Sequence, residues 1–230
     1  MADRPGPDFT CLAIESASQV CSIAACRDGQ IVGRSGSEPR HQSRHIFASI
    51  NEVLEELSVN LPELDCIAFG CGPGGFTGLR VGAAAVQALS FGASVPVCRI
   101  SSLASMAVGP VEQHGAERVA TCLDARMGEA YTAIYRADND LLVAAVLDDC
   151  LVDPATFAFD PALTLFAAGP GWRAHGELFE RHIDLISASD FELLPSAQHL
   201  LLLAEKRFQM GRISLPGEAL PNYIRDKVTG

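Results

Sequence analysis

The feature that most constrains the fold is a glycine-rich turn at residues 70–80, with the sequence GCGPGGFTGLR. The apolar run 67–69 precedes the turn, and a small-residue helical pattern over 80–89 follows it. A strand, a glycine turn and a helix in this order expose backbone N–H groups at a helix N-terminus, where they can hold an anion. Glycine also lets two backbones approach closely, because it carries no Cβ. The turn therefore indicates either a nucleotide site or a packing device.

Composition narrows the class of protein. Apolar residues make up 48% of the 230 residues, enough for a substantial core, and 17 basic against 28 acidic residues give a net charge of −11. A chain this acidic is a poor binder of nucleic acid, so a partner is expected to hold any RNA. The polar start and the lack of a long apolar run predict a cytoplasmic protein without a signal peptide or membrane span. The eight cysteines form no CxxC pair and are expected to be free, buried thiols.

Hydrophobic patterns predict a chain built in two halves. Three short strands joined by tight turns come first, and an amphipathic helix opens at residues 40–45. A strand at 65–70, the glycine turn with its helix, a strand at 95–100 and a helix capped by Ser101 follow. From residue 118 the order of strand, acid, turn and strand begins again, which indicates a pseudo-duplication.

These patterns give two predicted lobes. The first covers residues 1–108 and includes both helices next to the glycine turn. The second, over residues 109–215, is a degenerate copy in which prolines interrupt the helices and residues 196–210 form an amphipathic helix. The tail, from about 216 to 230, is expected to return to the first lobe.

Two segments could hold a nucleotide. Glu15 and Ser16 follow the first strand, where a carboxylate and small residues lie near phosphates in sugar-kinase or actin-like folds. Gly169, Gly171 and Trp172 form a second glycine turn, which could cap a base. Each has a plainer interpretation, because acids at strand ends are commonly exposed and a lone tryptophan is commonly buried in the core.

Catalytic and metal signatures are weak. His41 and His45 stand four residues apart, a spacing seen in metal sites, but a third ligand is lacking nearby and a role at the helix opening explains them equally well. Thr77 lies in a segment that only loosely matches a nucleophile elbow, and a Ser-His-Asp set is not legible. The sequence therefore predicts neither a catalytic residue nor a metal site.

Taken in order, six segments carry a family resemblance. They are residues 12–17, 20–24, 44–47, 68–82, 100–103 and 123–131, and residues 169–172 and 222–225 fit a weaker C-terminal pattern. Together they closely resemble the TsaB (YeaZ) family of bacterial tRNA threonylcarbamoyladenosine biosynthesis. The resemblance implies an α/β protein with an actin-like, two-lobed fold (the acetate and sugar kinase, Hsp70 and actin class, or ASKHA, ribonuclease H-like), in which mixed sheets are flanked by helices.

The resemblance also implies a function. Members are non-catalytic paralogues of TsaD, the enzyme that transfers threonylcarbamoyl to adenosine of tRNAs that read ANN codons. They pair with TsaD as heterodimers and help recruit the ATPase TsaE. No cofactor is expected on this chain, and the assembled complex is a candidate for binding ATP or ADP. Ser102 and Met106 stand where TsaD carries two metal-binding histidines, and serine with a thioether suits a hard metal poorly.

The implied partner surface is a helical bundle formed by helices at about 45–57 and 77–89. Small residues are expected to permit close approach and the isoleucines to supply apolar burial. The predicted interface residues are His45, Ile46, Ile50, Val53, Thr77, Gly78, Arg80, Val81, Gly82, Ala85 and Leu89. The same helices are expected to form a homodimer when TsaD is absent. Two rivals stay open: an active phosphotransferase or metallopeptidase of this fold, and a nucleotide-binding regulatory module.

Overall fold

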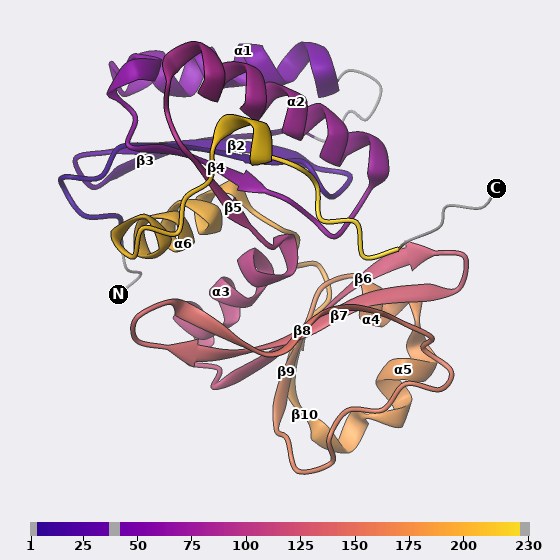
Figure 1. Cartoon of the computed structure of the whole chain (residues 1–230). Coiled ribbons are helices and arrows are strands. Elements are labelled where there is room, and N and C mark those ends of the chain that lie inside the picture. The colour runs from indigo at the N-terminus through magenta and orange to yellow at the C-terminus, as the bar shows by residue number, and fades with distance from the viewer. Residues whose placement is uncertain (1–3, 37–41, 226–230) are drawn as a thin grey trace.

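The computed structural model contains two five-stranded mixed sheets stacked one above the other (Figure 1). It describes residues 4–36 and 42–225, and of residues 42–45 the backbone alone. The first sheet has the order β3-β2-β1-β4-β5. Its strands are β1 (Cys11–Glu15), β2 (Cys21–Arg27), β3 (Gln30–Gly36), β4 (Cys66–Gly70) and β5 (Val97–Ile100). The three N-terminal strands are antiparallel neighbours, and β1, β4 and β5 run parallel.

The second sheet repeats this topology. Its order is β8-β7-β6-β9-β10, with β6 antiparallel to β7 and parallel to β9. Its strands are β6 (Arg118–Arg126), β7 (Glu129–Asp138), β8 (Leu142–Val152), β9 (Leu165–Ala168) and β10 (Ile186–Asp190). Strands β6 to β10 thus take the places of β1 to β5, as the restart of the hydrophobic pattern predicts. This duplicated sheet plan is the actin-like, two-lobed fold.

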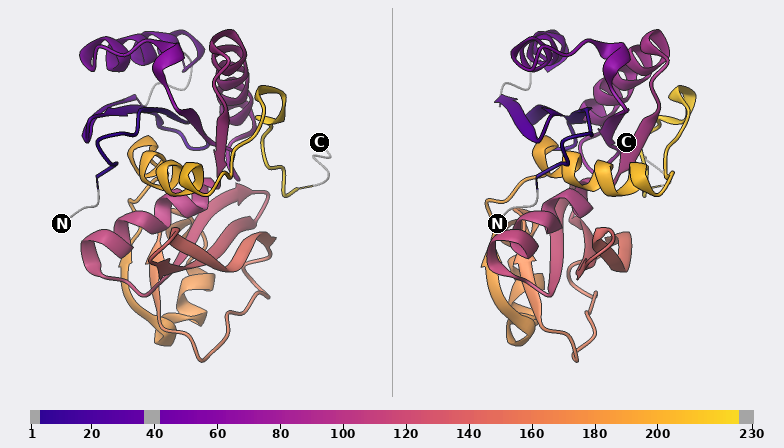
Figure 2. Two further views of the ribbon diagram at one scale, coloured as in Figure 1. Left: turned by 60° about the vertical axis from the view of Figure 1, so that its left-hand side comes forward. Right: turned by 90° about the vertical axis from the view of Figure 1, so that its left-hand side faces the viewer.

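Helices cover both faces of each sheet, so the structure has five layers (Figure 2). Helices α1 (Gln42–Glu56) and α2 (Phe76–Ala93) cover the outer face of the first sheet. The short α4 (Gly171–Ala174) and α5 (Gly176–Arg181) lie on the outer face of the second. Helices α3 (Ser102–His114) and α6 (Ala197–Gln209) lie between the sheets. The described residues also contain three short 3-10 helices: η1 (Leu61–Glu63), η2 (Ile183–Leu185) and η3 (Pro216–Glu218).

The two central helices are exchanged between the halves. Helix α3 follows β5 of the first half but packs against β6, β7, β8 and β9 of the second sheet. Helix α6 follows β10 of the second half but packs against β1, β2 and β4 of the first. The predicted boundary at residue 108 therefore falls inside α3, and α6 belongs in space to the first lobe rather than to the predicted second one. Sequence order alone does not reveal such an exchange.

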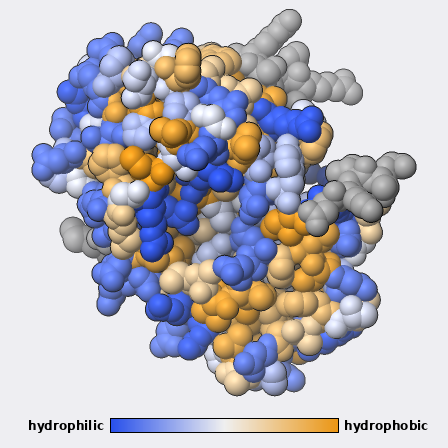
Figure 3. All heavy atoms as spheres, in the orientation of Figure 1, coloured by the Kyte–Doolittle hydropathy of each residue, from blue (hydrophilic) through white to orange (hydrophobic). Residues whose placement is uncertain are grey.

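Helix coverage explains the burial of the central strands. All five residues of β1 and of β4 are buried, because the inner face of the sheet meets α6 and the outer face meets α1 and α2. The core between the sheets takes residues from both lobes. On the face drawn in Figure 3, hydrophobic residues are scattered among hydrophilic ones over the first lobe and gather more broadly over the second.

The segment after α6 runs back along the first sheet. Ser214 forms an antiparallel bridge with Val97, and the Asn222 N–H donates to the Cys71 carbonyl at 2.7 Å. The Arg99 guanidinium donates to the Leu220 carbonyl at 2.9 Å. These bonds bring the described tail, up to residue 225, to Cys71 at the beginning of the glycine turn.

Candidate functional site

The glycine turn joins β4 to α2 and packs tightly against the turn after β1. A Cβ on Gly74 would overlap the Ala17 carbonyl, and the Gly75 N–H donates to that carbonyl at 2.7 Å. Gly72 has φ +96°, which L side chains rarely adopt. Its N–H donates to the Ser102 hydroxyl at 3.2 Å. These contacts use the glycines for close packing, the second of the two interpretations of the turn.

Glu15 lies inside this junction and not in a cleft. Its side chain is fully buried, Oε1 accepts the Ala17 N–H at 2.7 Å, and Oε2 accepts the Ser102 hydroxyl at 2.9 Å. A Cβ on Gly70 would overlap the carboxyl group, so only glycine leaves room for it. Burial raises the pKa of Glu15 to about 7, although both hydrogen bonds oppose the rise. Protein atoms thus enclose the Glu15 carboxyl group, and its place near a bound phosphate stays a prediction.

The remaining predicted nucleotide residues are also enclosed. The Ser16 hydroxyl donates to the Gly78 carbonyl at 2.9 Å and is buried. The Trp172 ring is 1% exposed, and its Nε1–H donates to the Ala120 carbonyl at 3.0 Å. A ring that is already covered cannot stack on a base.

The second glycine turn serves packing as well. Gly169 has φ +103°, and a Cβ on Gly171 would overlap Cys122 of β6. The plainer interpretation, a buried ring beside a tight turn, is therefore correct for residues 169–172.

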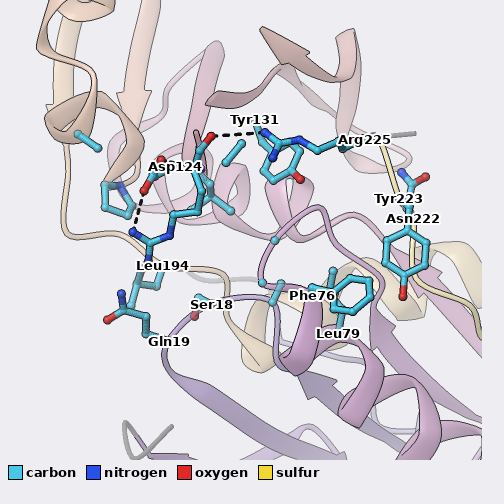
Figure 4. A pocket seen from close by; sticks show the side chains of 18 of the residues that line it. Ser18, Gln19, Phe76, Leu79, Asp124, Tyr131, Leu194, Asn222, Tyr223 and Arg225 are labelled. Carbon is cyan, nitrogen blue, oxygen red and sulfur yellow. Dashed lines mark hydrogen bonds and ion pairs between the residues drawn. The ribbon is translucent and has the colours of Figure 1, made fainter. Parts of the chain in front are cut away.

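A cleft of about 740 Å³ does open between the lobes (Figure 4). The first lobe lines it with the turn 17–20 and the start of α2, and the second lobe with the end of β6. Asp124 holds the hairpin there, because its Oδ1 accepts the Arg126 N–H at 2.8 Å and its Oδ2 lies 3.2 Å from that guanidinium. Arg126 and Met127 both have positive φ, and Met127 is 71% exposed beside the cleft. Strained, exposed residues of this kind are frequent at functional sites.

The C-terminal tail crosses the mouth of the cleft. Tyr223 packs on Phe76 with ring centroids 5.7 Å apart, and its hydroxyl accepts from Arg80 Nε at 3.1 Å. Two residues later Arg225 forms an ion pair with Glu129 of β7. The tail thereby ties α2 of the first lobe to the second lobe. The sequence showed only a weak motif at 222–225, because these contacts join residues far apart in the chain.

The positions aligned with the TsaD histidines carry no exposed ligand. Ser102 and Met106 are both fully buried in α3. Within residues 4–36 and 42–225, histidine, cysteine, aspartate and glutamate nowhere form a group of three that could hold a metal ion. His41 and the side chain of His45 lie outside the described residues. Over the same part of the chain, the structure contains no helix long and apolar enough to cross a membrane.

The predicted partner residues divide between two faces of α1 and α2. Six of them are buried against the chain's own first sheet: Ile46, Ile50, Val53, Gly78, Gly82 and Ala85. A Cβ on Gly82 would overlap the Ser16 hydroxyl, so this glycine brings α2 close to β1 and not to another protein. These six residues are buried in the folded chain because the apolar face of each amphipathic helix covers the sheet, and their role in partner contacts stays a prediction.

The opposite face of α2 is exposed. Thr77 and Arg80 lie on it, and Val81 and Leu89 are half-buried at its margin. Sequence reasoning missed Ala84, Ala88 and Phe91, which continue the same face at helical spacing, and Phe91 is 79% exposed. On α1, Phe47 is 46% exposed. We call residues 77, 80, 84, 88 and 91 the outer stripe of α2. The sequence contained a signal for this stripe, because residues 77, 80, 84, 88 and 91 repeat at the three- and four-residue spacing of one helix face.

The buried thiols agree with the expectation of free cysteines. All eight are free, and six are buried. Burial raises the pKa of several of these thiols, Cys71 to about 11 and Cys98 to about 12. Such thiols are structural rather than nucleophilic.

Comparison with known proteins places this geometry among close relatives. Residues 37–228 match the model of the family described as "TsaD: tRNA N6-adenosine threonylcarbamoyltransferase". The tRNA threonylcarbamoyladenosine biosynthesis protein TsaB of Escherichia coli K12 is 32% identical over 94% of this chain and 95% of its own. TsaB of Haemophilus influenzae is 32% identical over 96% of both chains. The structure of YeaZ from Pseudomonas aeruginosa superposes with a TM-score of 0.83 at 32% identity, covering 94% of this chain and 99% of that one.

Proposed function

The chain belongs to the TsaB (YeaZ) family of tRNA threonylcarbamoyladenosine biosynthesis, and we propose that it is a non-catalytic subunit that binds and supports the catalytic subunit TsaD. In this role the chain does not touch the adenosine that is modified. It keeps TsaD in a conformation competent to transfer threonylcarbamoyl to tRNAs that read ANN codons.

The outer stripe of α2 is the observation that carries the proposal. Ala84 and Ala88 are exposed one turn apart, so a partner helix can approach the backbone closely there. Phe91, at 79% exposure, offers a large apolar side chain at the end of the stripe, and Phe47 of α1 offers another. Exposed apolar groups on adjoining helices are typical of protein interaction surfaces. We place the TsaD contact on this outer face of α2 and α1, and not on the six predicted interface residues that are buried against the first sheet.

Four groups at the positions considered for catalysis or nucleotide binding are enclosed, which favours a non-catalytic role. Glu15, Ser16, Ser102 and Met106 are all enclosed by the chain's own atoms. Because general acids, nucleophiles and metal ligands must reach substrate, these enclosed groups favour a partner as the source of the chemistry.

The remaining parts of the proposal concern the complex. TsaE joins the heterodimer and brings its ATPase activity, and nucleotide binds in that assembly. The net charge of −11 favours indirect contact with tRNA, through TsaD. Without TsaD, the outer stripe pairs with a second copy of itself in a homodimer. We place the protein in the cytoplasm, with the tRNA that the pathway modifies.

The test introduces a charge on the stripe. Ala88→Glu puts a carboxylate at its centre and is expected to weaken TsaD binding at least about tenfold, because a buried unpaired charge is costly. Ile183→Asp is the control, since Ile183 is 50% exposed in η2 of the second lobe. Light scattering after gel filtration gives the mass of each mixture with TsaD, and thermal melting checks the fold. An unaltered heterodimer with Ala88→Glu would show that the stripe is not the interface.

The two rival functions, an active enzyme and a nucleotide-binding module, are tested by separate measurements. Hydrolysis of ATP, or a stoichiometric metal, in the purified chain would favour an active enzyme. Calorimetric titration of the isolated chain with ATP and with ADP tests the regulatory module, for which the inter-lobe cleft of about 740 Å³ is large enough. Saturable binding there, without TsaD, would replace the scaffold proposal by a nucleotide-binding one.

A further inference from the structure

A second cavity, of about 600 Å³, lies between the lobes, and Asn222 of the tail lines both it and the cleft. It shares no residue with the outer stripe of α2. Three arginines line it: Arg99 of β5, Arg207 of α6 and Arg212 just beyond α6. Cavities of this size are typical of small-molecule sites.

The three guanidinium groups have few partners. Within the described residues, none of them has a carboxylate within 4.0 Å, whereas seven other arginines do. Arg207 Nη1 donates to the Arg99 carbonyl at 2.7 Å, and Arg99 Nη2 donates to the Leu220 carbonyl at 2.9 Å. Arg99 Nε is buried without a hydrogen-bond partner. Each guanidinium has five donors, so most of the donors in this cluster are unused.

The second lobe lines the side of this cavity that lies opposite the three arginines. Asp149 of β8 lines the cavity and accepts a hydrogen bond from the Tyr135 hydroxyl at 2.7 Å. Tyr135 also lies 3.2 Å from the hydroxyl of Ser101, the residue that caps α3. Burial raises the pKa of Asp149, and the nearby Arg207 opposes that rise. Asp148 also lines the cavity and is exposed.

Three positive charges in one cavity are notable in a chain with a net charge of −11. Because no carboxylate of the described residues lies within 4.0 Å of these guanidinium groups, an anion bound among them would gain an attraction that Asp148 and Asp149 supply only from farther away. Planar guanidinium groups suit the paired oxygens of phosphate and carboxylate. The facing carboxylates of Asp148 and Asp149 suit a hydroxyl or ammonium group on the same ligand.

We propose that this cavity is a binding site for a small organic oxyanion, whose phosphate or carboxylate group lies among Arg99, Arg207 and Arg212. The site is separate from the proposed TsaD surface. It gives the chain a ligand of its own, held between the lobes, whether or not the scaffold proposal is correct.

The experiment uses the full chain and two probes. Calorimetry at constant ionic strength measures binding of inorganic phosphate and, separately, of malonate, with chloride as the balancing salt. At least one probe is expected to bind saturably, with a dissociation constant of about 1 mM or tighter. The two titrations distinguish a phosphate ligand from a carboxylate one.

Variants then locate the binding. Arg212→Gln removes an exposed guanidinium and is expected to weaken the bound probe about tenfold or more, as loss of a charged hydrogen bond does. Arg181→Gln is the matched control, because Arg181 is an exposed arginine of the second lobe that also lacks a carboxylate within 4.0 Å among the described residues. Equal melting temperatures confirm that both variants fold. Failure of both probes to saturate, or equal weakening by the two variants, would overturn the proposal.

Discussion

Replacing Glu15 by glutamine tests whether this buried side chain is a neutral carboxyl group in the folded protein. Its pKa rises from an ordinary 4.5 to about 7, chiefly through burial. Between these two values the unfolded chain has lost the proton and the folded chain has kept it. Stability therefore falls as pH rises through this window, and above pH 7 the cost is constant. Glutamine has no proton to lose, so the variant escapes this cost.

The magnitude follows from the size of the shift. One pKa unit corresponds to about 1.36 kcal/mol, so a rise of 2.5 units, from 4.5 to 7, costs the parent about 3 kcal/mol at high pH. At pH 5 only about 0.8 kcal/mol of this cost is present, and at pH 8 nearly all of it is. Relative to the parent, Glu15→Gln is therefore expected to gain about 2.5 kcal/mol between pH 5 and pH 8. A typical domain is stable by about 5–15 kcal/mol, so the gain is easily measured.

Urea unfolding of both proteins at closely spaced pH values gives this difference directly, because other titrating groups cancel in it. Asp138→Asn is the control. Hydrogen bonds from the Leu141 and Asp140 N–H groups lower the pKa of Asp138 below its ordinary 3.8, so its titration is complete before pH 5. Its effect on stability is expected to be constant across the window. A Glu15→Gln difference that is equally flat would refute the argument that burial keeps this carboxyl group neutral.

Two further predictions concern buried contacts and can be checked by the same unfolding assay. Gly82→Ala is expected to destabilise the protein by about 1–3 kcal/mol, because the new methyl overlaps the Ser16 hydroxyl. Gly92→Ala in the same helix is the control. Its new methyl meets nothing within 4 Å, so this variant is expected to stabilise the protein by up to about 1 kcal/mol. If both glycine variants lost stability, the overlap with Ser16 would not be the cause of the loss at Gly82. Trp172→Phe leaves the Ala120 carbonyl without its hydrogen bond and is expected to cost about 1–3 kcal/mol. Acrylamide quenching of the native Trp172 fluorescence is expected to be weak, and strong quenching would contradict the buried ring.

Local patterns were sufficient to predict most of the fold. The strand at 65–70, the glycine turn and the following helix appear as β4, the turn and α2, since alternation, glycine and helical spacing act over a few residues. The duplicated sheet was also predicted, because its second copy repeats the first in order. The exchange of α3 and α6 was not, since both helices are apolar enough to pack on either sheet.

The candidate sites were harder to predict for a different reason. Apolar spacing correctly identified Ile46, Ile50 and Val53 as one face of α1, but it does not say whether a sheet or a partner covers that face. Likewise, Glu15 looked like an exposed strand-end acid, since nothing local shows that Gly70 leaves room to bury it. The arginine-lined cavity joins residues 99, 207 and 212, whose meeting depends on the tertiary fold alone.

The exchanged central helices also bear on how the molecule can move and come apart. Each half contributes the helix that covers the inner face of the other half's sheet. Separating the two halves would therefore expose the inner faces of both sheets to solvent. Neither half is then an autonomous folding unit, and loss of one half should unfold the other in a single cooperative step. Because α3 packs on the second sheet and α6 on the first, a relative movement of the lobes would displace these two helices against each other, which is a shear within the core.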